Sequence, residues 1–326
     1  MSPRYSVPFL GLAIFNILNG KSSAQSFGNN TIVGCDVVDC PLSDDSVLAN
    51  CQVVNETFVN VGIARIPFRS ESPLDGLSWT EGVEFEDGDE GPIYDTRFYL
   101  GAPPTLSLGG LGACALFFRR TSDNVFFRTG NPNITEETQG VCEDALSQSC
   151  ISALNRRALD FEYDFTSVDD ACSSLGRHFL QNFDDECEEF AVNGNWSEIS
   201  VTAIAGQRDL EPISAEQNST SNCWPVVPKS HELIFVESFR EEGDSFVDTI
   251  HDKLFGIHPI LTVFFPRNST IITSPESHMT CLKTLSANDG RLVGDQLGDE
   301  SSASLLSPSK VAFASVISMA ISIFWL

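Results

Sequence analysis

The chain has few basic residues and lacks the short motifs that mark common enzyme families. It carries 19 Lys and Arg against 45 Asp and Glu, a formal net charge of −26. Such a field repels nucleic acid and anionic lipid, so the composition argues against a nucleic-acid partner and favours attraction to cations or basic partners; a merely solvated acidic surface is the alternative. The sequence has no Gly-x-Ser-x-Gly elbow, zinc-binding His-Glu-x-x-His, phosphate-binding glycine loop or Cys-x-x-Cys pair. We therefore predict no cofactor and nominate no catalytic residue.

Long apolar runs are scarce, and one of them begins near the first residue. Residues 7–18 are largely apolar and follow Arg4, and small residues precede Gln25. This arrangement of a basic end, an apolar stretch and a small-residue cleavage point is typical of a secretory signal peptide. We expect residues 1–24 to be removed, with an uncleaved anchor as the alternative.

The second apolar run covers residues 311–326 and contains no charge. A transmembrane helix needs roughly 20 apolar residues and usually a basic flank, so this shorter run fits a removed signal better. Small residues upstream and a polar spacer match the pattern for replacement by a glycosylphosphatidylinositol (GPI) anchor. We predict attachment at Ser301 or Ser302, a polar stalk over 286–301 and a propeptide over 302–326. A transmembrane segment is the alternative.

Six Asn-X-Ser/Thr sequons are spread along the chain, and none has proline in the middle position. An occupied sequon must lie on the surface, because the glycan is bulky and hydrated. With the signal peptide, the sequons predict a glycosylated extracellular domain over residues 25–285. The acceptors are Asn29, Asn55, Asn133, Asn195, Asn218 and Asn268.

The ten cysteines form an even set, which in an oxidising lumen predicts five disulfide bridges. A metal site at Cys35 and Cys40 is the competing interpretation, but its spacing is loose and the sequence shows no second paired cluster. The cysteines are Cys35, Cys40, Cys51, Cys114, Cys142, Cys150, Cys172, Cys187, Cys223 and Cys281.

A helical insert is predicted over about residues 139–191. Apolar residues recur at helical spacing between residues 139 and 159. Cys142 and Cys150 would then stand about 12 Å apart along one helix axis, beyond the reach of a disulfide. Both should therefore bridge to other elements.

A second helix should begin after Ser167, which forms a capping box with Asp170. We expect it to end near Asn182, because the acidic run that follows suits the start of a new helix better than the negative end of a long one. Two antiparallel neighbours would be tied by disulfides within this unit. The predicted pairings are Cys150–Cys172 and Cys142–Cys187.

Segments rich in Val, Ile and Phe and bounded by turn residues predict strands on both sides of the insert. The fold class expected is α+β, a mostly antiparallel β-sandwich with an inserted, disulfide-linked helical unit. The predicted strands are Thr57–Ile66, Arg97–Leu100, Gly112–Phe118, Asn124–Arg128, Glu198–Ile204, His231–Phe239, Pro259–Phe265 and Thr270–Thr273.

The densest acidic cluster is a weak candidate for a calcium site. Hard oxygen ligands suit Ca²⁺, yet the spacing fails the EF-hand template, and a solvated acidic loop explains the cluster equally well. Glycoside hydrolysis also needs two carboxylates, but no pair can be chosen among so many. The cluster consists of Glu84, Glu86, Asp87, Asp89 and Glu90.

Histidine and tryptophan offer further candidates. His251 and His258 could share one face of a helical stretch and bind a metal, although exposed or capping roles are the simpler interpretation. Trp79, Trp196 and Trp224 lie near turns or sequons and could stack on sugar rings, while packing in the core explains tryptophan as often.

The combination of a cleavable signal, many sequons, an even cysteine set, a serine-rich stalk and a hydrophobic tail resembles the GPI-anchored surface glycoproteins of filamentous fungi. The resemblance covers the architecture of the chain and carries over no functional residue. It implies residence at the outer face of the plasma membrane or transfer to cell-wall glucan. We expect a non-enzymatic surface glycoprotein that binds glycans or wall components. A secreted polysaccharide hydrolase is the alternative, and a secreted protein acting on a host or competitor is a third interpretation.

Overall fold

The computed structural model describes most of the chain between residues 32 and 285. The predicted signal peptide, stalk and propeptide lie outside the described residues, as do Asn29, Asn133, Ser301 and Ser302. Within the described part, no helix has the length and apolar character needed to cross a bilayer. The described ranges are 32–35, 38–42, 49–69, 71–89, 91–128, 140–164, 166–205, 210–242, 254–268 and 271–285.

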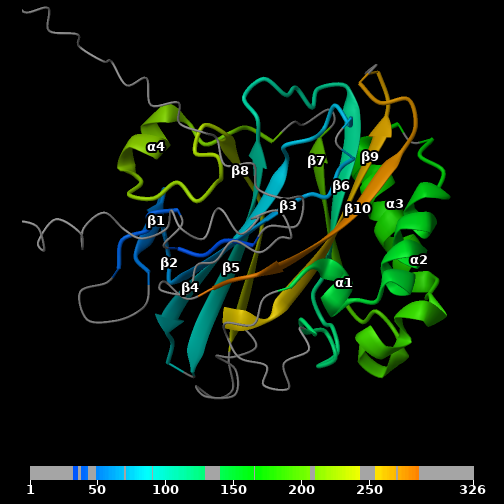
Figure 1. The fold of residues 1–326 in the computed structure, drawn as a ribbon, viewed down its shortest axis with the longest axis horizontal. Helices are drawn as coiled ribbons and strands as arrows, with labels where there is room; N and C mark the ends of the chain where they lie inside the picture. The colour runs from blue at the N-terminus through cyan, green and yellow to red at the C-terminus, as the bar shows by residue number, and fades with distance from the viewer. Residues whose placement is uncertain are drawn as a thin grey trace, which may run out of the picture.

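Two antiparallel sheets packed face to face form the centre of the molecule (Figure 1). One sheet has the strand order β3-β4-β5-β8 and the other β10-β9-β6-β7. The α+β, mostly antiparallel fold predicted from the sequence is thus confirmed. The strands are β3 (Asn60–Arg65), β4 (Ser78–Asp87), β5 (Pro92–Ala102), β6 (Leu111–Phe118), β7 (Ile199–Ala205), β8 (Glu232–Glu242), β9 (Ile257–Pro266) and β10 (Glu276–Lys283).

Aromatic and aliphatic side chains from both sheets fill the space between them. Trp79 on β4 is fully buried there, and its ring centroid lies 5.7 Å from that of Phe117 on β6. The indole Nε1 of Trp79 donates a hydrogen bond of 2.9 Å to Oγ1 of Thr262 on β9. Because the buried N–H has a partner, its desolvation is compensated, and the bond links the two sheets.

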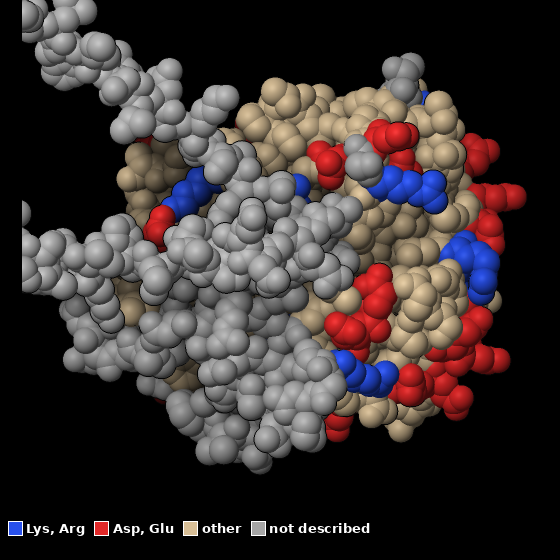
Figure 2. All heavy atoms as spheres, in the orientation of Figure 1, with Lys and Arg blue, Asp and Glu red and all other residues tan. Residues whose placement is uncertain are grey.

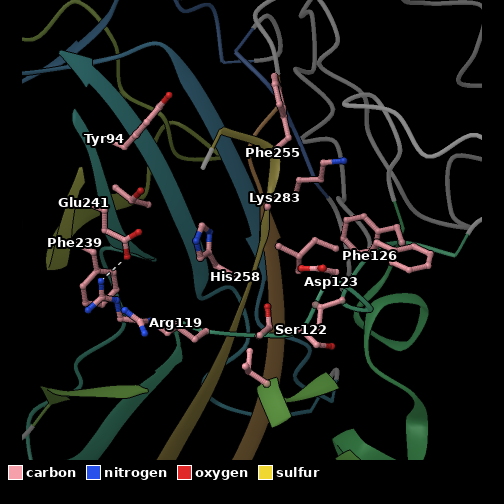
Figure 3. Close-up of a pocket in the computed structure, with 18 residues that line it drawn as sticks. Tyr94, Arg119, Ser122, Asp123, Phe126, Phe239, Glu241, Phe255, His258 and Lys283 are labelled. Carbon is pink, nitrogen blue, oxygen red and sulfur yellow. Dashed lines mark hydrogen bonds and ion pairs between the residues drawn. The ribbon is translucent and has the colours of Figure 1, made fainter. Parts of the chain in front are cut away.

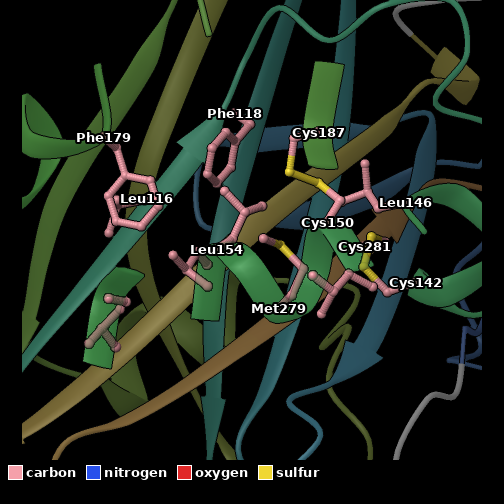
Figure 4. Packing of buried hydrophobic residues seen from close by; sticks show 14 of the residues in the cluster. Leu116, Phe118, Cys142, Leu146, Cys150, Leu154, Phe179, Cys187, Met279 and Cys281 are labelled. Carbon is pink, nitrogen blue, oxygen red and sulfur yellow. A yellow bond between two sulfur atoms is a disulfide. The ribbon is translucent and has the colours of Figure 1, made fainter. Parts of the chain in front are cut away.

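Helices cover the outer face of the β10-β9-β6-β7 sheet (Figure 4). Leu154 and Phe179 from the helices pack in one buried cluster with Leu116 and Phe118 of β6. Acidic side chains are dense along the side of the molecule where α2 and α3 lie (Figure 2). The helical elements are α1 (Cys142–Ala145), α2 (Gln148–Leu159), α3 (Val168–Gln181) and the 3-10 helices η1 (Asp185–Phe190) and η2 (Val192–Gly194).

The helix boundaries follow local capping chemistry. The first predicted helix is split into α1 and α2, because Ser147 caps a new helix by accepting a hydrogen bond from the backbone N–H of Cys150. The Ser167 side chain accepts from the Asp170 N–H at 3.0 Å, which confirms the predicted start of α3. That helix is capped at Asn182, and the acidic run after it forms η1, as predicted.

Four disulfide bridges are present, and both predicted pairings are wrong. The cysteines of α1 and α3 face the sheet rather than each other, so Cys172 bonds to Cys114 on β6 and Cys142 bonds to Cys281 on β10. The remaining two of the ten cysteines, Cys35 and Cys40, are buried free thiols. The bridges are Cys51–Cys223, Cys114–Cys172, Cys142–Cys281 and Cys150–Cys187.

A small hairpin covers the outer face of the β3-β4-β5-β8 sheet. It consists of β1 (Cys51–Val53) and β2 (Glu56–Phe58), and the short helix α4 (Ala215–Thr220) lies against β1. The Phe58 ring packs directly on Gly82, where a Cβ atom would lie 2.5 Å from the ring. Glycine at this position of β4 therefore allows the hairpin to approach the sheet.

Several strand predictions differ from the structure. β4 and β10 were not predicted, because one is rich in acids and the other in polar residues. The predicted strand Asn124–Arg128 contains turns instead, and the described part of Thr270–Thr273 lies before β10 without forming a strand. β4 and β10 are strands because of their pairing register and burial, which their polar composition does not indicate.

Candidate functional site: a cleft at one end of the sandwich

A cleft of about 630 Å³ opens where several strands end on the same side of the sandwich (Figure 3). It lies at the last residues of β8 and β10, just beyond the end of β6, and at the first residues of β5 and β9. Its volume is in the range of small-molecule sites. The walls combine aromatic rings with charged groups, notably Tyr94, Phe126, Phe239, Arg119, Glu241 and His258.

Arg119 is held rigidly in this cleft. Its Nη2 donates a hydrogen bond of 2.6 Å to Oε1 of Glu241, and its Nη1 donates to Glu198. The guanidinium carbon lies 4.2 Å from the centroid of the Phe239 ring, in a cation–π contact. The Phe239 ring is fixed in turn by edge contact with Phe117. The cleft therefore presents a preorganised ion pair on an aromatic wall.

His258 forms the floor of the cleft and touches a buried carboxylate. Nδ1 of His258 lies 2.7 Å from Oε1 of Glu81, whose side chain is 1% exposed while that of His258 is 24% exposed. This contact lacks the alignment of a hydrogen bond, and Oε2 of Glu81 has no hydrogen-bond partner among the described residues. The Phe98 ring meets the imidazole edge-on at 5.7 Å. Glu81 thus places a buried carboxyl group behind a histidine that reaches the cleft.

The sequence contained a signal for Glu81 that was missed because β4 was not predicted. Trp79, Glu81 and Val83 alternate along β4 and face the interior between the sheets, where an acidic residue is unexpected. His258 lies on β9 and does not continue a helix, so it shares no helix face with His251. His251 lies outside the described residues, so the proposed metal-binding pair stays a prediction.

The Ser122 hydroxyl in the lining of the cleft is not free to act as a nucleophile. Oγ of Ser122 donates a hydrogen bond of 2.6 Å to the carbonyl oxygen of Glu189, and it accepts one from the Asn124 N–H. The geometry therefore gives no support to acyl transfer through Ser122.

The predicted acidic cluster is not brought together as one site. Glu84 faces the hairpin side of β4, Glu86 pairs with Arg240 at 2.8 Å, and Asp89 is exposed in the turn after the strand. Asp87 ends β4, and Glu90 lies outside the described residues.

Glu84 instead joins a different group of carboxylates beneath the hairpin. One carboxylate oxygen each of Glu56, Glu84 and Asp95 lie within 4.8 Å of one another. Nη2 of Arg97 lies 2.8 Å from both Glu56 and Asp95. Burial, followed by the hydrogen bond with Glu56, raises the pKa of Glu84 to about 7. Glu84 is therefore partly protonated near neutral pH.

The remaining predicted residues are found in two environments. Trp79 and Trp196 are buried, so the interpretation that they stack on sugar rings is wrong. Trp224 is half-buried, and its Nε1 donates a hydrogen bond to the carbonyl oxygen of His231. The sequon asparagines that the structure describes are all exposed. They are Asn55, Asn195, Asn218 and Asn268.

Comparison with known proteins adds no family to these observations. No family model matches the chain, and neither a curated protein nor a solved structure matches it.

Proposed function

We propose that the chain is a GPI-anchored cell-surface or cell-wall glycoprotein, non-enzymatic, which binds a glycan in the cleft at the end of the sandwich. The cleft carries the proposal, because it combines aromatic faces with a rigid, paired set of hydrogen-bonding groups. Sugar rings present apolar C–H faces and peripheral hydroxyls, and such a lining complements both. The exposed sequons and the sequence signals support residence outside the cell.

The geometry of Arg119 favours recognition over catalysis. Its guanidinium is engaged by Glu241 and Glu198 and packed on Phe239, so it offers its remaining donors in fixed directions. Fixed donors and acceptors reduce the entropy lost on binding a flexible saccharide.

Binding can be tested with soluble cell-wall oligosaccharides, such as β-glucan and chitin fragments, by calorimetry on the secreted protein. Phe126→Ala removes a half-buried aromatic wall of the cleft, and we expect affinity to fall about tenfold, or ~1.4 kcal/mol. Phe235→Ala is the matched control, because Phe235 is an exposed phenylalanine on β8 that does not line the cleft. Equal affinity of both variants, or no binding of any fragment, would contradict the proposal.

The anchor has a separate test. Intact eukaryotic cells that express the full chain should release it when treated with a phosphatidylinositol-specific phospholipase. Replacement of Ser301 and Ser302 by bulky residues should abolish release and surface display together. Retention on the membrane with the C-terminal residues still attached would show a transmembrane segment instead.

A polysaccharide hydrolase is the second candidate, and one observation favours it. Asp123 and Glu241 lie on opposite sides of the cleft with His258 between them (Figure 3). Glycosidases place two carboxyl groups roughly 5 to 9.5 Å apart across the bond they cleave. The experiment measures the rate at which reducing sugar is released. A fall of more than ~100-fold in both Asp123→Asn and Glu241→Gln would favour this function over binding alone.

A further inference from the structure

Four of the ten cysteines meet in one buried cluster beneath the hairpin. Cys35 and Cys40 come from the segment before β1, Cys51 is the first residue of β1, and Cys223 follows α4. Their exposures are 0%, 7%, 0% and 6%, so no bulk water separates the sulfur atoms.

The free thiol of Cys40 touches the bridge next to it. Sγ of Cys40 lies 2.7 Å from Sγ of Cys223, which is bonded to Cys51. A disulfide bond is ~2.05 Å long, so Cys40 is placed almost as close to Cys223 as a bonded partner. The Cys40 thiol is also hydrogen-bonded to Cys35. Each sulfur in the cluster therefore has a neighbour with which it could pair.

We propose that these four cysteines form a thiol–disulfide exchange centre in which Cys40 and Cys51 compete for Cys223. In the exchange, the thiolate of Cys40 attacks Sγ of Cys223. The Cys40–Cys223 bond forms, the Cys51–Cys223 bond breaks, and Cys51 leaves as a thiolate that takes up the proton lost by Cys40. One disulfide and two thiols are present before and after, so the step needs no oxidant or reductant.

A second exchange within the same cluster is also balanced. Cys35 can attack Cys40 in the new bridge, which forms Cys35–Cys40 and releases Cys223 as a thiolate that takes up the proton from Cys35. The bond then lies entirely within the segment before β1.

The exchange changes what is tied to the hairpin. While Cys51 is bonded to Cys223, it links β1 covalently to the segment after α4; once Cys40 is bonded to Cys223 instead, apolar packing and hydrogen bonds hold β1 to that segment. These include the bond from the Val54 N–H to Oγ of Ser221 at 2.8 Å and the bond from the Gln52 N–H to Oδ1 of Asn222 at 2.5 Å. The hairpin carries Glu56 into the carboxylate group, so the exchange also loosens that contact.

The environment sets the rate of the exchange. The hydrogen bond to Cys35 and burial together raise the pKa of the Cys40 thiol well above its usual value. Only the thiolate attacks a disulfide, so the exchange should be slow at neutral pH and should accelerate about tenfold per pH unit.

The Cys35→Ser variant of the full secreted protein gives the decisive test, because it removes the competing Cys35–Cys40 bond. The variant is incubated at pH 9, quenched in acid, alkylated in denaturant and digested before aspartate without reduction. Asp36, Asp39 and Asp44 separate the three cysteines near the N-terminus into different peptides. Mass spectrometry should find both Cys51–Cys223 and Cys40–Cys223, while Cys51–Cys223 alone at equilibrium would overturn the proposal.

Two controls keep the result interpretable. Within the cluster, Cys40→Ser should contain Cys51–Cys223 as its one bridge. The bridge Cys114–Cys172, outside the cluster, should stay intact in every sample. If Cys35→Ser does not fold, Cys51→Ser by itself leaves Cys35, Cys40 and Cys223 as the three sulfurs in the cluster. Part of this secreted protein should carry the Cys40–Cys223 bond at pH 9, and its absence at equilibrium would contradict the exchange centre.

Discussion

The two outer faces of the sandwich are covered in different ways. On the β10-β9-β6-β7 side, three disulfides fasten the helices to the sheet and to η1, and apolar side chains fill the contact. On the β3-β4-β5-β8 side, a hairpin lies over a group of carboxylates in which Glu84 has a raised pKa, and over a bridge with a free thiol beside it. One cover is covalently fixed, whereas the other depends on pH and on thiol chemistry. A ligand or a change of environment would therefore act more easily through the hairpin.

The largest effect should come from removing a bridge on the helical side. The double variant Cys114→Ala/Cys172→Ala frees a loop closed by residues 58 positions apart, which corresponds to about 4 kcal/mol of lost stability in the loop-entropy model. Urea unfolding of variant and parent measures the difference. A loss below ~1 kcal/mol would mean that packing alone fixes the helices.

Tight packing between α3 and β7 should produce the next effect. A Cβ atom on Gly176 would lie 2.5 Å from Cγ2 of Val201, so Gly176→Val should cost about 1–3 kcal/mol through overpacking. Ser173→Val, on the exposed side of the same helix, is the matched control and should change stability by less than ~0.5 kcal/mol. Similar urea midpoints for the two variants would show that the helix moves freely over the sheet.

The hairpin side should tolerate loss of its bridging cysteine. In Cys51→Ala, Cys40 can bond to Cys223, and the sequence separation changes only from 172 to 183. Loop closure is then nearly unchanged, and the expected loss is about 1 kcal/mol from the removed buried sulfur. A loss as large as that of the Cys114→Ala/Cys172→Ala variant would show that no substitute bridge forms.

The smallest effect is a pH dependence confined to the carboxylate group. The pKa of Glu84 is raised from 4.5 to about 7, so the folded state holds a proton that the unfolded chain has lost in this window. Its contribution to stability is greatest below pH 4.5 and decreases as the pH rises toward 7, by less than ~1 kcal/mol because the site is partly solvated. Urea midpoints from pH 4.5 to 8 should show this slope in the parent. Glu84→Gln should flatten it, and Glu86→Gln should leave it unchanged.

Much of the fold could be predicted from the sequence where the signal is local. Helix α3 followed from its cap and apolar stripe, and β6 from an uninterrupted apolar run, since both depend on neighbours in the chain. β4 was missed because its acids face different surroundings: Glu81 is buried against His258, and Glu84 lies beneath the hairpin. Such contacts join residues far apart in sequence, and no spacing rule reports them.

The disulfide pairing failed for the same reason. The helical pattern placed Cys172 correctly on a buried stripe but did not show whether helix or sheet covered that stripe. The cleft was likewise beyond the sequence, because its lining comes from the ends of five strands that meet only in the folded sandwich.

The positions of the tryptophans give each layer its own optical reporter. Trp79 lies between the sheets and Trp196 in the helical layer, and Trp224 packs against the buried residues beneath the hairpin, which include Phe58 and Cys223. Variants that keep one of these three indoles and replace the others by phenylalanine would let fluorescence follow the unfolding of each layer separately. Loosening of the hairpin would then be visible as a change at Trp224 while the signals from Trp79 and Trp196 stay constant.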